Sequence, residues 1–307
     1  MVEKINKYIE SLPLNISPDG LYAPIRYTMS MGGKRLRPVL MMLAYEMWKD
    51  SGEDILPQAA ALEMYHNFTL LHDDVMDNAE MRRGRPTVHV KWDVNTAILS
   101  GDNMLCLSMK MMGTNPDVIT TFINTTIEIN HGQQYDVDFE ERDDVSEEEY
   151  IDMIRLKTGV LLACALKIGG LMAGAPKDDV EKLYRFGISL GLAFQLQDDY
   201  LDVYGDPKTF GKKIGGDILC NKKTYMLINA LRLSDNRDWL DADYATPEEK
   251  IAAVTGIYNS LGIDKLAVAK IDAYYAEALE TLASINVPEE RKAQLREYAS
   301  KMMMRQK

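Results

Sequence analysis

The chain has 307 residues, of which 46% are hydrophobic and 27% are charged, and its formal net charge is -12. This share of apolar side chains is enough for a large core and excludes an intrinsically disordered chain. The negative charge argues against nucleic acid as the main partner, because proteins bind phosphate backbones with dispersed Lys and Arg side chains.

No stretch has the composition of a linker, so we expect one domain over residues 1–307. The first residues lack the apolar segment of a secretion signal, and the most apolar stretch, 159–176, carries Lys167 in its middle. We therefore expect no signal peptide and no stable insertion into a membrane.

The cysteines are Cys106, Cys164 and Cys220, which lie far apart and have neither zinc-ligand nor redox spacing. We expect three buried thiols in a reducing compartment. The sequence thus predicts a cytoplasmic protein.

Helix-forming residues dominate the whole chain, and strand-like alternation of β-branched residues is hard to find, which predicts an all-α protein. Clusters of Gly, Pro, Asn and Asp mark the expected helix breaks. In chain order these breaks are residues 12–20, 52–57, 113–116, 174–176, 205–216 and 235–247.

Two helix starts match the S/T-x-x-E capping box, in which two side chains satisfy free amides of the first turn. One pairs Ser146 with Glu149, and the other pairs Thr246 with Glu249. The first follows an acidic run, 139–150, which we interpret as a solvated face without chemistry.

A D-D-x-x-D motif occurs twice, about 125 residues apart, at Asp73–Asp77 and at Asp198–Asp202. Helix residues four apart differ by about 40° around the axis and about 6 Å along it, so the outer aspartates of each motif share a face. Neighbouring carboxylates raise one another's pKa, and a cation removes this cost. Oxygen ligands suit Mg2+, which shares its remaining positions with water and substrate phosphates.

Both motifs follow apolar segments, residues 68–71 and 191–196, where solvated charge runs are uncommon. Basic residues complement them: residues 32–38 read GGKRLRP and residues 82–85 read RRGR. An acidic protein that concentrates Arg and Lys beside a carboxylate cluster favours a phosphate-bearing ligand. At this point a hydrolase, a cyclase and a transferase all remain possible.

These segments resemble the trans-prenyltransferases, the isoprenyl or polyprenyl diphosphate synthases, in order and spacing from about residue 20 to 225. The resemblance is carried by GGKRLRP (32–38), EMYH (63–66), LHDDVMD (71–77), RRGRPT (82–87), KT (157–158), FQLQDDYLD (194–202) and GKKIGGDI (211–218).

The resemblance implies a single-domain, all-α bundle around a deep central cavity, with the two aspartate motifs facing each other at its mouth. It also implies a homodimer that joins an allylic diphosphate to isopentenyl diphosphate, with release of pyrophosphate and a gain of five carbons. Three Mg2+ ions are typical of the family, and Mn2+ can substitute for Mg2+.

The same resemblance assigns roles to residues of this chain. The expected metal site consists of Asp73, Asp74, Asp77, Asp198, Asp199 and Asp202, among which Asp73, Asp77 and Asp198 are the main ligands. The isopentenyl diphosphate site is expected to contain Lys34, Arg37, His66 and Arg83. The allylic diphosphate is expected to contact Arg82, Lys157, Lys213 and Lys222.

The carbocation left after pyrophosphate departs needs dipoles nearby rather than full anions. By resemblance, the Lys157 carbonyl, the Thr158 hydroxyl and the Gln195 amide oxygen fill this role. The final proton passes to pyrophosphate, so no histidine base is required. We therefore interpret His72 as a structural helix residue.

Product length is expected to depend on Phe68 and Thr69, the residues five and four before Asp73, because they point along the same helix wall. Phe68 is large enough to block a growing chain, and long-chain members of the family tend to have alanine there. This predicts farnesyl or geranylgeranyl diphosphate as the product, with a longer polyprenyl diphosphate as the alternative.

Three other functions compete. An HD-type metal phosphohydrolase built on His66, His72 and Asp73 would leave the second motif unexplained. A type I terpene cyclase normally replaces the second aspartate motif with an Asn/Ser/Glu triad. A regulatory subunit of a heteromeric synthase would have lost some aspartates or basic ligands, whereas this chain keeps all of them.

Overall fold

The structure is a computed structural model that describes residues 1–206, 214–240 and 242–304. In these residues the secondary structure is helical except for one two-stranded antiparallel hairpin, β1 (Met81–Arg82) and β2 (Arg85–Pro86). The predicted all-α fold is therefore confirmed.

The chain divides into two compact units, each with its own internal packing. Unit 1 contains residues 1–123 and 165–180, and unit 2 contains residues 124–164 and 181–307. Three helices, α7 (Pro116–Glu140), α9 (Val160–Ala173) and α10 (Lys177–Tyr204), have residues in both. The expectation of a single domain over 1–307 stays a prediction.

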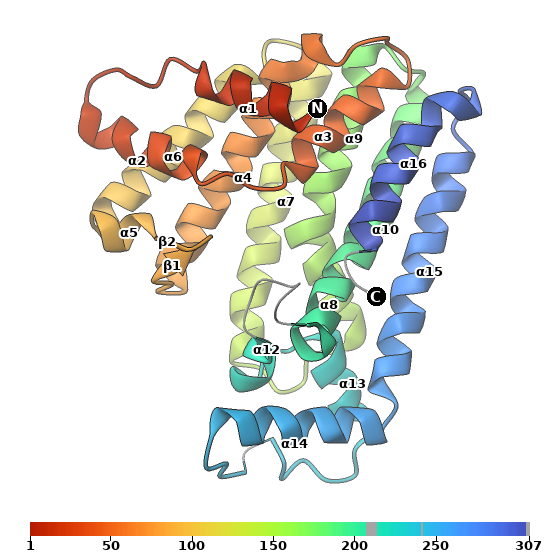
Figure 1. Ribbon diagram of the computed structural model, residues 1–307. Coiled ribbons are helices and arrows are strands. Elements are labelled where there is room, and N and C mark those ends of the chain that lie inside the picture. Colours follow the sequence, from red (N-terminus) through yellow and green to blue (C-terminus); the bar gives the residue numbers. More distant parts are fainter. Residues whose placement is uncertain (207–213, 241, 305–307) are drawn as a thin grey trace. The chain divides into compact units, whose positions relative to one another are not determined.

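Unit 1 is built around α4, which is buried along most of its length and packs against α6, α3, α1 and α2 (Figure 1). The helices that lie wholly in this unit are α1 (Val2–Glu10), α2 (Asp19–Ser30), α3 (Leu36–Glu46), the 3-10 turn η1 (Glu53–Ile55), α4 (Leu56–Met76), α5 (Val88–Lys91) and α6 (Val94–Met111).

Helices α4 and α6 approach closely where Gly101 of α6 faces His72 of α4. A Cβ atom at position 101 would lie 2.2 Å from Nε2 of His72, so a larger residue there would require the His72 ring to move. The ring nitrogen of His72 lies 3.2 Å from the Ile98 carbonyl oxygen. His72 thus lies in a helix–helix contact, which is where a structural residue would be placed.

Unit 2 has a core of apolar side chains that includes Tyr150, Met153, Leu196 and Ile263. Its helices α15 and α16 pack against each other (Figure 1). The elements wholly in this unit are α8 (Glu147–Ile154), the π-helix η2 (Arg155–Gly159), α12 (Gly216–Leu219), α13 (Tyr225–Leu233), α14 (Pro247–Ser260), α15 (Ile263–Ala283) and α16 (Glu289–Met303).

The π-helix η2 is the local feature that the sequence did not predict. Two glycines, Gly132 of α7 and Gly191 of α10, pack against it: added Cβ atoms would lie 2.5 Å from the Lys157 nitrogen and 2.6 Å from the Gly159 Cα. π-Turns are rare and occur frequently at functional sites. Here the turn carries Lys157 and Thr158.

The predicted breaks at 12–20, 113–116 and 174–176 mark the gaps before α2, α7 and α10, and the break at 52–57 contains the 3-10 turn η1 that precedes α4. The break at 235–247 lies between α13 and α14, with residue 241 outside the described residues, and most of the break at 205–216 also lies outside them. The capping box of Ser146 and Glu149 is present in both directions. The Thr246 hydroxyl oxygen accepts a hydrogen bond from the Glu249 amide, as predicted. The Glu249 carboxylate, however, accepts from the Ala245 amide and not from the Thr246 amide. The second box is therefore only half confirmed.

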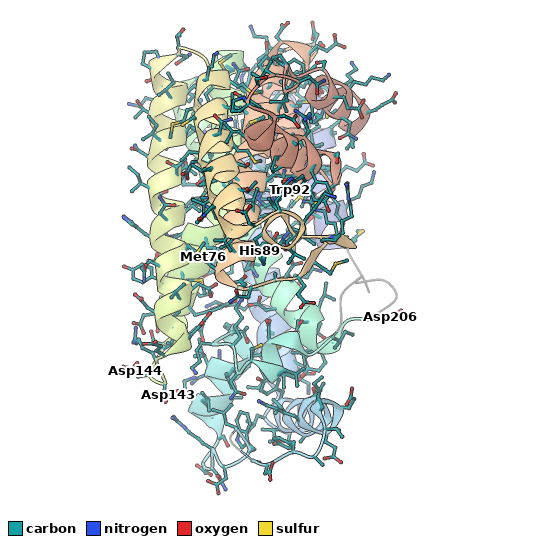
Figure 2. The ribbon with its side chains drawn as sticks, turned by 90° about the vertical axis from the view of Figure 1, so that its left-hand side faces the viewer. Met76, His89, Trp92, Asp143, Asp144 and Asp206 are labelled. Atoms are coloured by element: carbon teal, nitrogen blue, oxygen red, sulfur yellow. The ribbon has the colours of Figure 1, made fainter. Side chains whose placement is uncertain are left out.

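Within the acidic run 139–150, the side chains of Asp143 and Asp144, labelled in Figure 2, are 91% and 81% exposed, as expected of a solvated face, whereas Phe139, Val145 and Tyr150 are buried. The expectation of buried cysteines is wrong for Cys106 and Cys220, which are exposed, and right for Cys164. Cys106 lies in α6, and Cys220 directly follows the short helix α12.

One continuous stretch, residues 147–173, is long and apolar enough to cross a membrane, with a mean hydropathy of 1.5. Of its most apolar window, 72% is buried inside the protein. A core helix has these properties, and the expected absence of a membrane span stays a prediction.

Candidate functional site

The first aspartate motif lies at the C-terminal end of α4. Asp73 is in the last turn, and Asp77 follows Met76, the final helix residue, which Figure 2 labels. The Asp77 amide donates to the Asp73 carbonyl at 2.8 Å, so the helical spacing continues through Asp77. Carboxylates at a helix C-terminus face the negative end of its dipole, which a bound cation would offset.

Asp74 differs from its two neighbours because it is buried and paired with Arg82. Arg82 donates from Nε at 2.7 Å and from Nη2 at 2.6 Å to the same oxygen, Oδ1. Asp74 is 4% exposed, whereas Asp73 is half-buried and Asp77 is exposed. The pair ties the hairpin that carries Arg82 to the end of α4.

The loop before α3 holds the first group of basic residues. Gly32, Gly33 and Arg35 all have positive φ angles, of 73°, 140° and 50°. The left-handed conformation of Arg35 is uncommon for a residue with a side chain. It is held by an ion pair with Glu63 at 2.6 Å, in which both side chains are at most 3% exposed. Arg35 also donates to Asn6 and to the Met29 carbonyl.

The second basic group lies on the β1–β2 hairpin and reaches this loop. Arg83 donates to the Gly32 carbonyl. A Cβ atom at position 33 would lie 3.1 Å from the Arg83 guanidinium, so a glycine at position 33 allows this approach. The GGKRLRP and RRGR segments, about 50 residues apart in the sequence, are thus brought together.

His66, about two turns before Asp73 on α4, lies among these cations. Burial of the ring, followed by the charges of Arg37, Arg83, Arg82 and Arg35, holds the pKa of His66 well below its ordinary value. The imidazole is therefore neutral near pH 7. Desolvation, with the charges of Arg35 and Arg82, also lowers the pKa of Arg83. The repulsion between these neighbouring positive charges costs free energy, and a bound anionic ligand would remove this repulsion.

The hairpin is anchored to α2 through Tyr27. The Tyr27 hydroxyl donates to the Pro86 carbonyl at 2.8 Å, and its ring lies 4.1 Å below the Arg85 guanidinium. Trp92 packs edge-on against the same ring at 5.2 Å. These contacts hold the hairpin, and with it Arg82 and Arg83, beside α2.

The two residues expected to set product length lie one to two turns before Asp73 on α4. Phe68 is half-buried, 4.8 Å from the His72 ring and 5.6 Å from the Tyr65 ring. Tyr65 in turn meets Phe122 at 5.2 Å. The Thr69 hydroxyl bonds back to the His66 carbonyl. Phe68 therefore belongs to a row of rings that runs from His72 through Phe68 and Tyr65 to Phe122.

The second aspartate motif lies in the last two turns of α10. Asp198 and Asp202 are half-buried, and Asp199 is 7% exposed. Oδ2 of Asp202 accepts the Asp217 amide in the first turn of α12 at 2.9 Å. Burial and the charge of Asp217 raise the pKa of Asp199 to about 7, against the opposing effects of Tyr150, Lys222 and Gln195.

Lys157 and Lys222, both expected to bind diphosphate, meet at Asp136 of α7. Lys157 donates to Asp136, and the charge of Lys222 reaches the same carboxylate. Burial alone would raise the pKa of Asp136, but these two cations outweigh it and lower the pKa. Lys213 lies outside the described residues.

Thr158 and Gln195, expected to face a carbocation, are bonded to each other: the Thr158 hydroxyl donates to Oε1 of Gln195 at 2.9 Å. Gln195 also donates to Asp199, as does the buried Tyr150. Tyr150, Asp136 and Asp217 were not predicted as site residues, because each is a single residue outside a repeated motif. The available signals were the position of Tyr150 at the end of the acidic run and that of Asp217 within the GKKIGGDI segment.

The carboxylates suit a hard cation that brings other ligands with it. Within residues 1–206, 214–240 and 242–304, no three His, Cys, Asp or Glu side chains could hold a metal ion by themselves. Each motif offers aspartates on one helix face, a donor set that fits Mg2+ completed by water and phosphate oxygens.

Comparison with known proteins gives consistent matches. The model of the polyprenyl synthetase family matches residues 18–261. Geranylgeranyl diphosphate synthase of Methanosarcina mazei is 39% identical over 273 residues, covering 86% of this chain and 84% of that protein. Geranylfarnesyl diphosphate synthase of Natronomonas pharaonis is 36% identical over 286 residues, covering 85% and 84%.

A crystal structure of a geranylgeranyl pyrophosphate synthase matches with a TM-score of 0.93 at 41% identity, over 100% of this chain and 99% of that chain. The matched region therefore spans the positions of both aspartate motifs and of the basic segments described above.

Proposed function

This chain belongs to the polyprenyl synthetase family and is a prenyltransferase, and we propose that it joins an allylic diphosphate to isopentenyl diphosphate to make a short-chain trans-prenyl diphosphate. The observation that carries this proposal is the basic cluster of unit 1, which consists of Arg35, Arg37, Arg82 and Arg83 around His66. In a chain of net charge -12, four arginines act on the neutral His66, next to the carboxylates of Asp73 and Asp77.

We assign the isopentenyl diphosphate to Lys34, Arg37, His66 and Arg83. The arginine forks bind phosphate oxygens in pairs, and a neutral imidazole donates one further hydrogen bond. This pocket needs no metal, because its cations already match the charge of the diphosphate. The ion pair between Arg82 and Asp74 fixes the position of the β1–β2 hairpin, and with it Arg83, relative to α4.

We assign the allylic diphosphate to the aspartates together with Arg82, Lys157, Lys213 and Lys222. Asp73, Asp77, Asp198 and Asp202 would hold Mg2+, three ions by family resemblance, with Mn2+ as a substitute. Bound Mg2+ supplies Lewis-acid stabilisation of the charge on the departing pyrophosphate. Lys157, directed by Asp136, adds a fixed positive charge to the same leaving group.

The bond between the allylic C1 and the diphosphate oxygen breaks, and its electron pair leaves with pyrophosphate. The double bond of isopentenyl diphosphate then attacks C1, and a proton lost from the resulting cation passes to pyrophosphate. Oxygens of Lys157, Thr158 and Gln195 stabilise the positive carbon without a full anion that could trap it.

The direct test is incubation of the purified protein with isopentenyl diphosphate, Mg2+ and dimethylallyl, geranyl or farnesyl diphosphate. We expect products longer by five carbons per step, read by mass spectrometry. A protein that forms no longer product, or that instead releases phosphate from nucleotides without isopentenyl diphosphate, would contradict the proposal.

We propose farnesyl or geranylgeranyl diphosphate as the product, with Phe68 as the barrier to a growing chain and with the rings of Tyr65 and Phe122, which pack behind it, as further barriers. Phe68→Ala is expected to lengthen the product by one or two five-carbon units and no more, since Tyr65 is 1% exposed and stays in place. Mass spectrometry of the product checks this, with Phe186→Leu, a fully buried core ring of α10, as the control. An unchanged product profile would remove Phe68 as the barrier.

We also propose a cytoplasmic homodimer. Support for the dimer comes from the outer face of α6, where Ile98, Leu99 and Met109 are 41%, 61% and 37% exposed. Such a row of apolar side chains on one helix is typical of a covered surface. Light scattering on the purified protein checks the oligomeric state.

A further inference from the structure

Four side chains of unit 2 form one chain of hydrogen bonds. Tyr150 of α8 donates its hydroxyl proton to Oδ2 of Asp199, and Nε2 of Gln195 donates to Oδ1 of Asp199 at 3.0 Å. Thr158 of η2 donates to Oε1 of Gln195 at 2.9 Å. Tyr150 is 1% and Asp199 is 7% exposed, so water competes little for these bonds. Every proton in the chain points toward the Asp199 carboxylate.

This direction follows from the chemistry of the carboxylate. Both oxygens of the Asp199 carboxylate accept hydrogen bonds, so Gln195 turns Nε2 toward Asp199 and Oε1 away from it. Oε1 then needs a donor, which the Thr158 hydroxyl provides. The lone pairs of the Thr158 oxygen remain on the other side, away from Gln195.

The opposite amide orientation would have the opposite effect. With Nε2 of Gln195 facing Thr158, the Thr158 oxygen would accept, and its own proton would point outward. A hydroxyl proton facing a carbocation repels it, whereas oxygen lone pairs attract it. One buried carboxylate therefore decides the sign of a dipole two side chains away.

We propose that Asp199 and Tyr150 are positioning residues of prenyl transfer, which hold Gln195 so that Thr158 presents lone pairs to the cationic carbon. This inference rests on the proposed function, in which the Thr158 and Gln195 oxygens stabilise that carbon. The inference also gives Asp199 a different role from Asp198 and Asp202. Both oxygens of Asp199 accept hydrogen bonds from protein donors, so Asp199 orients Gln195 and does not bind Mg2+.

Asp199→Asn tests this, because an amide at position 199 can donate to Gln195 and permit the reversed orientation. We expect kcat to fall about 100-fold, the scale of losing one preorganised dipole. KM for both diphosphates and the Mg2+ concentration for half-maximal activity are expected to stay within about twofold, since neither the basic residues nor Asp198 changes. Tyr150→Phe removes one of the two donors and is expected to lower kcat about tenfold.

Tyr184→Phe is the matched control. The Tyr184 hydroxyl also lies within bonding distance of a carboxylate, that of Glu128, at 3.5 Å. Tyr184 is on the same helix as Gln195, about 16 Å from it along the helix axis. We expect its kcat to equal that of the wild type. Circular dichroism melting shows whether each variant is folded, and a loss of kcat that only follows the unfolded fraction would overturn the proposal.

A double-mutant cycle separates positioning from a direct role. Thr158→Val should lower kcat, and adding Asp199→Asn to it should lower kcat by no more than about twofold further, because Asp199 acts through Thr158. Fully multiplicative effects would overturn the proposal. So would recovery of Asp199→Asn at high Mg2+, which would make Asp199 a metal ligand.

The orientation of the Gln195 side-chain amide can be measured independently of enzyme activity. In protein labelled with 15N-glutamine, the Gln195 side-chain signal, identified by its loss in Gln195→Ala, should show one proton shifted downfield by the carboxylate. The shift should vanish in Asp199→Asn, and its absence from the wild type would overturn the positioning claim. A wild type that makes no product but shows this shift would overturn only the proposed function.

Discussion

Asp73→Asn is expected to lower kcat on the order of 10³-fold, the equivalent of several kcal/mol of transition-state stabilisation from a bound metal ion. Asp73 is half-buried at the C-terminal end of α4, on the same face as Asp77 and beside the basic cluster. An amide keeps the size of the side chain but removes the charge that holds a cation at this helix end. Initial rates over a range of Mg2+ concentrations measure the effect.

The control for this variant is Asp143→Asn. Asp143 belongs to the acidic run before α8, and its side chain is 91% exposed. We expect it to keep the activity and the Mg2+ dependence of the wild type. If Asp73→Asn retained more than about a tenth of the wild-type kcat, metal-assisted ionisation through the first motif would be excluded.

Glu63→Gln is expected to reduce the free energy of unfolding by about 3–5 kcal/mol, the cost of removing one partner from a buried ion pair. Arg35 and Glu63 are 3% and 2% exposed, and their nearest atoms are 2.6 Å apart. The neutral amide leaves the Arg35 charge buried without compensation. Arg35 is also held in a left-handed conformation at the start of α3, so the loop with Lys34 should loosen as well.

Chemical denaturation followed by circular dichroism measures this change. Glu53→Gln is the matched control, because it breaks the pair of Glu53 with Lys4, whose side chains are 60% and 55% exposed. Solvent screens such a pair, and we expect a much smaller change. The double variant Arg35→Met, Glu63→Met should be more stable than Glu63→Gln, since it removes both charges; the reverse order would contradict the buried-charge explanation.

Local pattern was sufficient to predict the class of the fold. The helix breaks and the Ser146 cap depend on residues within a few positions of each other, and backbone preferences act over that range. The outer aspartates of each motif were also predictable to share a face, because four residues make about one turn. The cysteines show the limit of this approach: spacing carries no information on which helix faces solvent.

The sequence by itself determined that this is a helical protein with two carboxylate clusters and two basic segments, because periodicity and charge are local properties. Only the tertiary structure decided which groups meet. Arg83 reaches Gly32 across about 50 residues, Asp136 joins Lys157 to Lys222, and Tyr150 contacts Asp199. The π-helix belongs with these contacts, since it forms where glycines of two other helices allow close approach. Such contacts depend on packing between segments distant in the chain, which no local preference specifies.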